Sequence, residues 1–113
     1  MLALPVRQPW AELILLGLKD IEYRSRRTNI RGRVYLYATL NRIDPEDEAE
    51  IEEESGIDID GLPRGVLVGT VEIFDCQPSE EGDFEWLLRN PERLATPQKP
   101  AKKPCSGGFF QPF

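Results

Sequence analysis

Three side chains near the N-terminus, Lys19, Glu22 and Arg24, together carry the groups that a polar ligand site needs. Glu22 and Arg24 are two positions apart, so in a β-strand they face the same way. Arginine binds carboxylate or phosphate through a bidentate fork, and burial turns lysine into a base or nucleophile. A glutamate beside that lysine can orient it or carry a proton. The spacing fits either a cleft for an anionic ligand or a surface ion-pair cluster.

The composition restricts the chemistry that is available. The 113 residues include no histidine and two cysteines, Cys76 and Cys105, which show no metal-binding spacing. Without histidine, the Ser–His and Cys–His nucleophile pairs and the commonest metal ligand are excluded. We therefore expect no metal ion and no cofactor. With no signal peptide or membrane-spanning run, we expect a cytoplasmic protein with reduced thiols and no membrane partner.

Charge is distributed unevenly along the chain. The net charge is −6, but residues 1–42 hold 8 basic and 3 acidic residues, whereas residues 43–60 hold 10 acidic and no basic residues. Because the distribution matters more than the total for an anionic partner, this net charge does not exclude nucleic acid. The acidic segment is interpreted as a solubilising surface, a fence that repels long polyanions, or a surface for a protein partner.

The elements that must position the three side chains follow from the hydrophobic pattern. Residues 9–17 have apolar side chains at helical spacing, with proline at the first position and Gly17 suited to end the helix. Residues 20–24 alternate, which predicts a strand. Lys19 then lies at the turn between the helix and the strand.

Two later segments are predicted strands. Residues 33–40 alternate, and residues 65–76 are rich in β-branched side chains. Gly69 within the second segment indicates a bulge or a close approach by another element. Strict alternation puts Val68 and Glu72 on one face, so we expect Glu72 to be partly buried in the cleft.

The remaining segments complete a single domain over residues 1–113. Residues 45–55 are a predicted surface helix inside an acidic helix–loop insertion at 43–60. Residues 84–94 fit a strand or a short helix, and residues 96–108 are a predicted loop. Short strands with two helices and glycine turns predict an α+β fold with a small curled sheet or barrel.

Several segments of the chain resemble the ASCH domain family. They are PVRQPWAELILLGLKDIEYRSRRTNIRGRVYLYA, GVLVGTVEIFDC, and FEWLLRNPERL followed by GGFF. The G-x-K-x-x-E-x-R motif of that family is met by Gly17, Lys19, Glu22 and Arg24, and the RQPW lead-in by Arg7–Trp10. The resemblance covers nearly the whole chain except the acidic segment. It implies a PUA-like mixed β-barrel with two to three flanking helices, related to RNA-binding domains.

The resemblance also implies a cleft that binds RNA or a modified nucleoside or nucleotide. Lys19, Glu22, Arg24 and Glu72 would form its polar centre. Trp10 is expected either in the core or as a stacking platform at the cleft mouth, and Gln8 either in the cleft or as a helix cap. The predicted ligand-binding residues are Arg7, Gln8, Trp10 and Arg24.

An enzymatic alternative stays open. Some relatives are small amidohydrolases that act on N4-acetylcytidine with a lysine, a threonine three residues later and a glutamate on a later strand. Lys19 and Glu72 match the lysine and the glutamate, but Glu22 stands where the threonine would be, and a carboxylate repels a developing oxyanion. Another relative is a metal-dependent ribonuclease, and Glu22 with Glu72 offers two hard oxygen ligands. Lys19, Glu22 and Glu72 are therefore the candidate catalytic residues.

Two further groups of cations fit either solvated surfaces or contacts to phosphate. The first is a basic run that follows the motif, and the second lies among prolines near the C-terminus. They are Arg26, Arg27, Arg31 and Arg33, and Lys99, Lys102 and Lys103.

Overall fold

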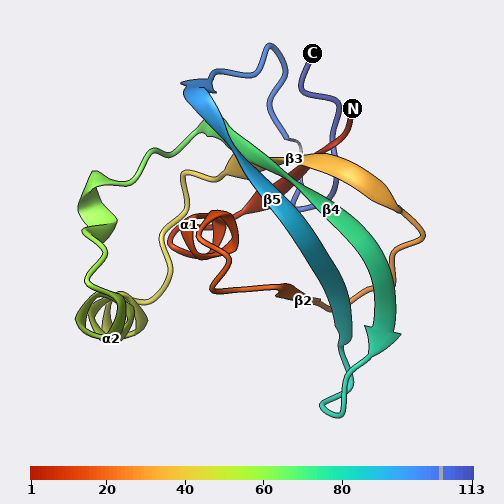
Figure 1. Cartoon of the computed structure of the whole chain (residues 1–113), viewed down its shortest axis with the longest axis horizontal. Helices are drawn as coiled ribbons and strands as arrows, with labels where there is room; N and C mark the ends of the chain where they lie inside the picture. The colour runs from red at the N-terminus through yellow and green to blue at the C-terminus, as the bar shows by residue number, and fades with distance from the viewer. Residues whose placement is uncertain (105) are drawn as a thin grey trace.

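The structure is a computed structural model that describes residues 1–104 and 106–113. Within these residues the chain forms five strands, two α-helices and one short 3-10 helix. In chain order they are β1 (Ala3–Val6), α1 (Trp10–Leu15), β2 (Ile21–Arg24), β3 (Gly32–Ala38), α2 (Pro45–Ser55), η1 (Ile59–Gly61), β4 (Val66–Pro78) and β5 (Phe84–Gln98). The two ends of the chain lie near each other (Figure 1).

The strands form one curled mixed sheet in the order β1-β3-β4-β5-β2. β1 runs parallel to β3, and every other neighbouring pair is antiparallel. β4 and β5 form a long bent hairpin (Figure 1). The curl brings the edge strands β1 and β2 together, so that Arg24 in β2 donates a hydrogen bond of 2.6 Å to the carbonyl of Pro5 in β1. We call this meeting of the two edges the seam. The predicted α+β fold with a small curled sheet is confirmed.

The main core lies between the sheet and α1. Ala11 and Ile14 of the helix are buried against Val34 and Leu36 of β3 and against the inward side chains of β4 and β5. The predicted helix over residues 9–17 is real but shorter, since the chain leaves helical geometry after Leu15. Burying this apolar helix on three strands fixes the position of the turn that follows it.

A second, smaller core covers the other face of β3. Tyr37 is 5% exposed there and packs edge-on against Phe110, with ring centres 5.4 Å apart. The C-terminal segment is held by two hydrogen bonds between the backbones of Ala3 and Phe110. The alternation predicted for β3 is thus confirmed, and the C-terminal segment joins the sheet through a single bridge between Ala3 and Phe110.

β4 does not keep the strict alternation that the sequence predicts. Its pairing with β5 shifts register at three places. Val68 faces the main core at the first of these shifts, and Val71 at the second shift and Ile73 just after it also face the core. Glu72 therefore lies on the opposite face from Val71 and Ile73, and the predicted shared face of Val68 and Glu72 is wrong because of the bulges.

Gly69 permits the close contact between α1 and the hairpin. A Cβ atom at this position would lie 2.4 Å from Cδ2 of Leu15 and 2.6 Å from the carbonyl oxygen of Glu92. The close approach predicted for Gly69 is confirmed, as is an irregularity in the strand beside it. Glycine is required here because any side chain would push the helix away from the sheet.

The acidic segment forms the predicted surface helix α2. The Asp44 side chain accepts a hydrogen bond of 2.9 Å from a backbone N–H in the first turn, and no residue of α2 is buried. Arg42 attaches the helix by pairing with Glu48 at 2.9 Å and with Asp60 at 2.6 Å. Ile59, in a stretch predicted as loop, is 2% exposed within η1.

The remaining predictions concern the C-terminal half of the chain, the cysteines and membrane-spanning segments. Residues 84–94 belong to β5, which also takes the first residues of the predicted loop at 96–108. Cys76 is a buried free thiol, and Cys105 lies outside the described residues. Among the helices described, none has the length and apolar character to cross a membrane.

Candidate functional site

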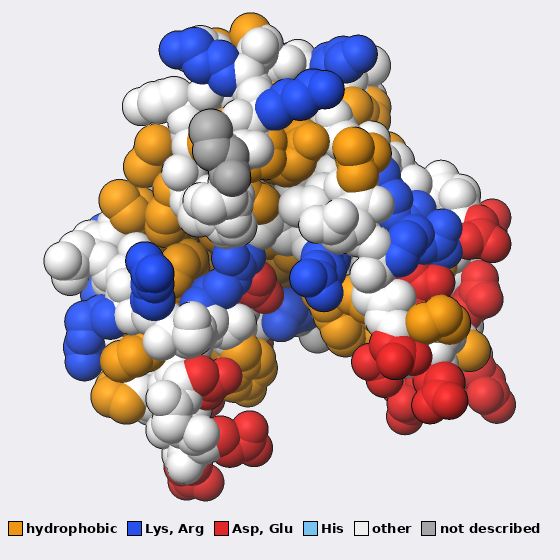
Figure 2. All heavy atoms as spheres, turned by 180° about the vertical axis from the view of Figure 1, so that it is seen from behind, with side chains coloured by type: hydrophobic (Ala, Val, Ile, Leu, Met, Phe, Trp, Pro, Cys, Tyr) orange, Lys and Arg blue, Asp and Glu red, His pale blue; other side chains and the backbone are white. Residues whose placement is uncertain are grey.

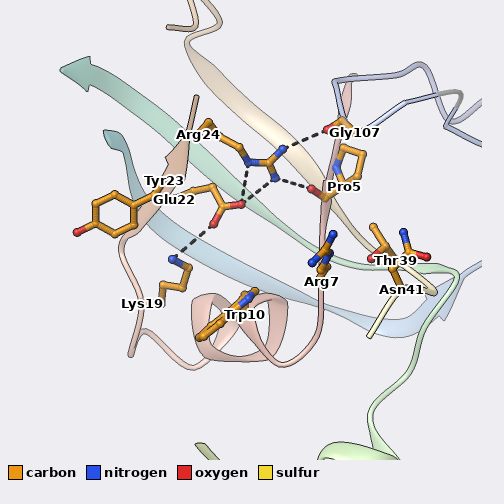
Figure 3. Close-up of a pocket in the computed structure, with 10 residues that line it drawn as sticks. All are labelled: Pro5, Arg7, Trp10, Lys19, Glu22, Tyr23, Arg24, Thr39, Asn41 and Gly107. Atoms are coloured by element: carbon orange, nitrogen blue, oxygen red, sulfur yellow. Dashed lines mark hydrogen bonds and ion pairs between the residues drawn. The ribbon is translucent and has the colours of Figure 1, made fainter. Parts of the chain in front are cut away.

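Lys19, Glu22 and Arg24 meet at the seam, where they line a cavity of about 710 Å³ (Figure 3). We call it the central cavity. Its walls come from the ends of β1 and β3, from α1, from β2 and from the C-terminal segment. The lining residues are Pro5, Arg7, Trp10, Lys19, Glu22, Tyr23, Arg24, Thr39, Asn41 and Gly107.

Arg24 closes the seam and holds Glu22 in place. Its Nε and Nη2 donate to Oε2 of Glu22 at 2.9 and 2.7 Å. Nη2 also donates to the Pro5 carbonyl at 2.6 Å, and Nη1 to the Gly107 carbonyl at 3.1 Å. Charge-assisted bonds of this kind are about twice as strong as neutral ones. Because most of its N–H groups are committed to protein acceptors, Arg24 positions the site and keeps little of its fork for a ligand.

Glu22 is the buried carboxylate at the centre of the site, with 8% of its surface exposed. Oε2 accepts both bonds from Arg24, and Oε1 lies 3.5 Å from Nζ of Lys19. A carboxylate has about four lone-pair positions. Two are filled by Arg24 and one faces Lys19, so one position on Oε1 remains for a donor in the cavity.

The turn after α1 positions Lys19 in the cavity. Gly17, with φ +77°, reverses the chain between the helix and β2. The ammonium group donates a hydrogen bond to the Ile21 carbonyl and forms an ion pair with Glu22, in which Nζ lies 3.5 Å from Oε1. It also lies 5.7 Å from the ring centre of Trp10 and 5.5 Å from that of Tyr23. Among the described residues, the Ile21 carbonyl is the one hydrogen-bond acceptor of this ammonium group, so it keeps N–H donors for a ligand near the two aromatic rings.

Arg7 and Trp10 form another part of the wall. Trp10 is half-buried, packs against the main core and also lines the cavity, so its predicted core position is found and its stacking role stays a prediction. Arg7 is exposed, and within the described residues its side chain makes no hydrogen bond or ion pair. It is the cation of this cavity that is left for an anionic group.

Gln8 is not brought to the cavity. It is fully buried, and its Oε1 accepts the N–H of Glu12 while its Nε2 donates to the Pro63 carbonyl, each at 3.0 Å. The structure thus gives Gln8 the capping role that the sequence left open, at a backbone N–H in the first turn of α1. Its predicted place among the ligand-binding residues is corrected.

Glu72 is not brought to the cavity either. On the outer face of β4 its Oε2 accepts a bond of 2.8 Å from Arg89, and its Oε1 accepts one of 3.2 Å from Asn90. The hydrogen bond from Arg89 holds the pKa of this carboxyl below its ordinary value. The expected place of Glu72 in the cleft is corrected, because the bulges in β4 reverse its side chain.

The basic run after the motif falls into two pairs of arginines with different surroundings. Arg33 donates to the Thr70 hydroxyl at 2.8 Å and pairs with Glu92 at 3.4 Å, while Arg31 pairs with Asp75 at 3.8 Å. Both arginines are thus bound to side chains of the sheet itself. Arg26 and Arg27 are exposed and make no ion pair among the described residues.

Sequence reasoning missed five of the lining residues, which are Pro5, Tyr23, Thr39, Asn41 and Gly107. The parallel pairing of β1 with β3 sets Val6 opposite Ala38, so the segments that follow the two strands enter the cavity wall at the same edge of the sheet. No local pattern in the sequence reports that pairing. Among the described residues, no group of three or more His, Cys, Asp or Glu side chains is placed to hold a metal ion.

The curled mixed sheet, the helix on one face and the polar cavity at the seam define a small PUA-like α+β domain. The chain belongs to the ASCH domain family, whose sequence model matches residues 4–100. Among solved structures, an ASCH protein from Zymomonas mobilis has the same fold, with a TM-score of 0.57 over 87% of this chain and 72% of the other, at 15% identity.

Two curated relatives are both called Activating signal cointegrator 1, from Homo sapiens and Mus musculus. Each is 32% identical to this chain over 111 residues, which covers 80% of this chain. The alignment takes in 19% of each relative, so this chain spans about a fifth of their length.

Proposed function

We propose that this chain binds RNA or a modified nucleoside, with one base in the central cavity. One observation carries the proposal: the Lys19 ammonium group lies 5.7 and 5.5 Å from the ring centres of Trp10 and Tyr23, and 3.5 Å from Oε1 of the Glu22 carboxylate in the same cavity. Nucleobases present donors and acceptors on one edge, and their flat faces stack on aromatic side chains. A carboxylate is a natural acceptor for the amino group of cytosine.

The charge of the cavity supports a ligand that carries phosphate. Lys19 and Arg24 outnumber Glu22, and Arg7 adds a further positive charge that no carboxylate among the described residues neutralises. Phosphate contacts from such cations supply much of the affinity of nucleic-acid-binding proteins. Family membership agrees, since the resemblance of the motif implies binding of RNA or modified nucleosides.

The enzymatic alternatives have weaker support. Hydrolysis of N4-acetylcytidine by Lys19 would need Glu72 nearby, and Glu72 is bound to Arg89 on the outer face of β4. A metal-dependent ribonuclease that uses Glu22 and Glu72 meets the same separation. Of the three candidate catalytic residues, Lys19 and Glu22 share the cavity.

Calorimetry tests the proposed binding directly. Cytidine, N4-acetylcytidine and a nine-nucleotide RNA would be titrated into the wild type and into Trp10→Leu, which keeps apolar volume but removes the stacking face. Stacking on an aromatic side chain is worth about 1–3 kcal/mol, so the affinity is expected to fall about 5- to 150-fold. Lys19→Met is expected to reduce binding of the same ligands.

Lys99→Met is the matched control, because Lys99 is exposed and lies outside the central cavity. Equal affinities in wild type and Trp10→Leu would reject the cavity as the base site. Acetate released from N4-acetylcytidine by the wild type but not by Lys19→Met would instead establish the amidohydrolase.

A further inference from the structure

The central cavity continues into two neighbouring cavities. It shares Pro5, Thr39, Asn41 and Gly107 with a cavity of about 440 Å³. It shares Arg24 and Gly107 with another of about 350 Å³. Both volumes lie within the range of about 300–1,000 Å³ that is usual for ligand sites. The three cavities therefore adjoin one another around Gly107, and we call the three together the groove.

Each of the two side cavities carries one cation without a partner. Lys103 lines the 440 Å³ cavity and Arg26 lines the 350 Å³ cavity, and we name the cavities after them. Both residues are exposed, and among the described residues neither side chain makes a hydrogen bond or an ion pair. Elsewhere on the surface, several arginines form ion pairs with carboxylates. They are Arg31, Arg33, Arg42, Arg89 and Arg93.

Acidic side chains line a further cavity that adjoins the central one. This cavity of about 960 Å³ meets the central one at Tyr23 and is lined by Glu80, Glu81 and Asp83 of the β4–β5 turn and by Glu85 at the start of β5. Figure 2 shows basic side chains gathered around the groove, with acidic ones on two projecting lobes. A polyanion that enters the central cavity would be repelled from these lobes and attracted toward Lys103 and Arg26.

On the basis of the function proposed above, we infer that the ligand is an internal nucleotide of a single RNA strand. Its base occupies the central cavity, and the chain leaves on both sides through the Lys103 and Arg26 cavities, where these cations contact phosphate. An unpaired base is required, because a base within a duplex does not expose the edge that Lys19 and Glu22 read.

The flanking cavities hold backbone rather than bases. Their aromatic walls, Tyr37 and Trp86, are 5% and 6% exposed, and Trp86 is already stacked on Phe109 at 5.4 Å. Neither ring offers a free face to a base. The identity of the central base therefore sets the affinity, and the neighbouring bases have little influence on it.

The test uses nine-nucleotide RNAs of uridine with one variable base, either at the fifth position or at the 3′ end. The variable bases are adenine, guanine, cytosine and N4-acetylcytosine, and the corresponding nucleosides are titrated in parallel. The preferred base should bind several-fold more tightly at the centre than at the end. Arg26→Ala and Lys103→Ala should each lower the ratio of RNA affinity to nucleoside affinity. Each should also reduce the slope of log affinity against log salt by about 0.7.

Arg27→Ala and Lys102→Ala are the matched controls, since each removes the same charge one position away and lines none of the three cavities. Equal binding of central and terminal bases, or equal effects of the four variants, would overturn the internal-strand assignment even if nucleosides bind. Loss of nucleoside binding in Trp10→Leu would still support the proposed function in that case. A wild type that binds neither RNA nor nucleoside would overturn both.

Discussion

At the scale of single residues, the motif contributes to folding as well as lining the central cavity. Glu22 is a carboxylate with 8% exposure, and a buried charge is tolerated when it is paired and hydrogen-bonded. Arg24 supplies that pairing and joins the two sheet edges through the Pro5 carbonyl. The same side chains that shape the cavity therefore also close the barrel-like sheet.

Replacement of Arg24 should destabilise the protein strongly. Arg24→Ala leaves the Glu22 carboxylate without its main partner and opens the seam, so we expect the free energy of unfolding to fall by about 2–4 kcal/mol. Arg24→Lys should recover part of this loss, because lysine keeps the charge but lacks the fork. Urea unfolding measures both. Lys99→Ala, at an exposed position without a partner among the described residues, should change stability by less than about 0.5 kcal/mol.

The two glutamates show how far sequence reasoning reaches at this scale. Glu22 lies in a strand of 4 residues with regular pairing, so its spacing to Arg24 predicted their contact correctly. Glu72 lies in a strand of 13 residues, and the bulges there invert its side chain. Where a bulge falls depends on how β4 pairs with β5, which the local pattern does not contain.

At the scale of elements, α2 depends on charge rather than on burial. It has no buried residue, and Arg42 ties it to the rest of the segment through Glu48 and Asp60. Hydrogen bonds from Arg42 hold the pKa values of both carboxyls below their ordinary values of 4.5 and 3.8. A carboxyl whose pKa is lowered on folding stabilises the protein above its unfolded pKa, and this contribution disappears as the pH falls through the folded pKa.

Arg42→Gln should therefore lower the Tm in a pH-dependent way. The difference in Tm from the wild type should be constant between about pH 5.5 and 8 and should shrink below about pH 4, as Glu48 and Asp60 become protonated in both proteins. Thermal unfolding followed by circular dichroism across this range measures it. A difference that persists unchanged at pH 2 would show that packing by the Arg42 side chain, and not the ion pairs, holds the segment.

The packing of α1 against the β4–β5 hairpin depends on Gly69. Gly69→Ala places a methyl group against Leu15 and against the Glu92 carbonyl, so the helix or the hairpin must move. Overpacking of this kind costs about 1–3 kcal/mol. Gly69→Ala with Leu15→Ala should restore little stability, because the clash with the backbone carbonyl remains. Gly108→Ala is the control, since its nearest atom would be 3.7 Å away in ordinary contact. Full recovery in the double variant would place the strain on Leu15 alone.

At the scale of the whole molecule, the sequence predicted the layers but not the seam. Hydrophobic periodicity was enough for the helix, for most of the strands and for the acidic insertion. The groove depends on the meeting of β1 with β2 and on the C-terminal segment that supplies Gly107. Contacts between residues this far apart in the chain leave no periodic signal, so the cavity walls contributed by Thr39 and Gly107 could only be found in three dimensions.

The charge of the whole molecule gives the last prediction. The acids of α2 and of the β4–β5 turn form the projecting lobes beside the basic groove (Figure 2). If the α2 lobe excludes long polyanions, neutralising Glu50, Glu53 and Glu54 to glutamine should raise the affinity for a duplex or a long RNA several-fold at low salt. The affinity for a nucleoside should not change. The helix itself should gain stability, since Glu53 and Glu54 oppose the dipole at its C-terminal end.

The same titrations in 0.05 M and 0.5 M salt separate the explanations. Screening reduces the reach of exposed charges to about 10 Å at 0.1 M and less above that, so the gain in affinity should vanish at the higher salt. An equal gain for nucleoside and long RNA would mean that the triple variant alters the cavity rather than the electrostatic repulsion of polyanions by α2. No gain at either salt would leave the acidic helix with a purely solubilising role and assign selection for single strands to the groove alone.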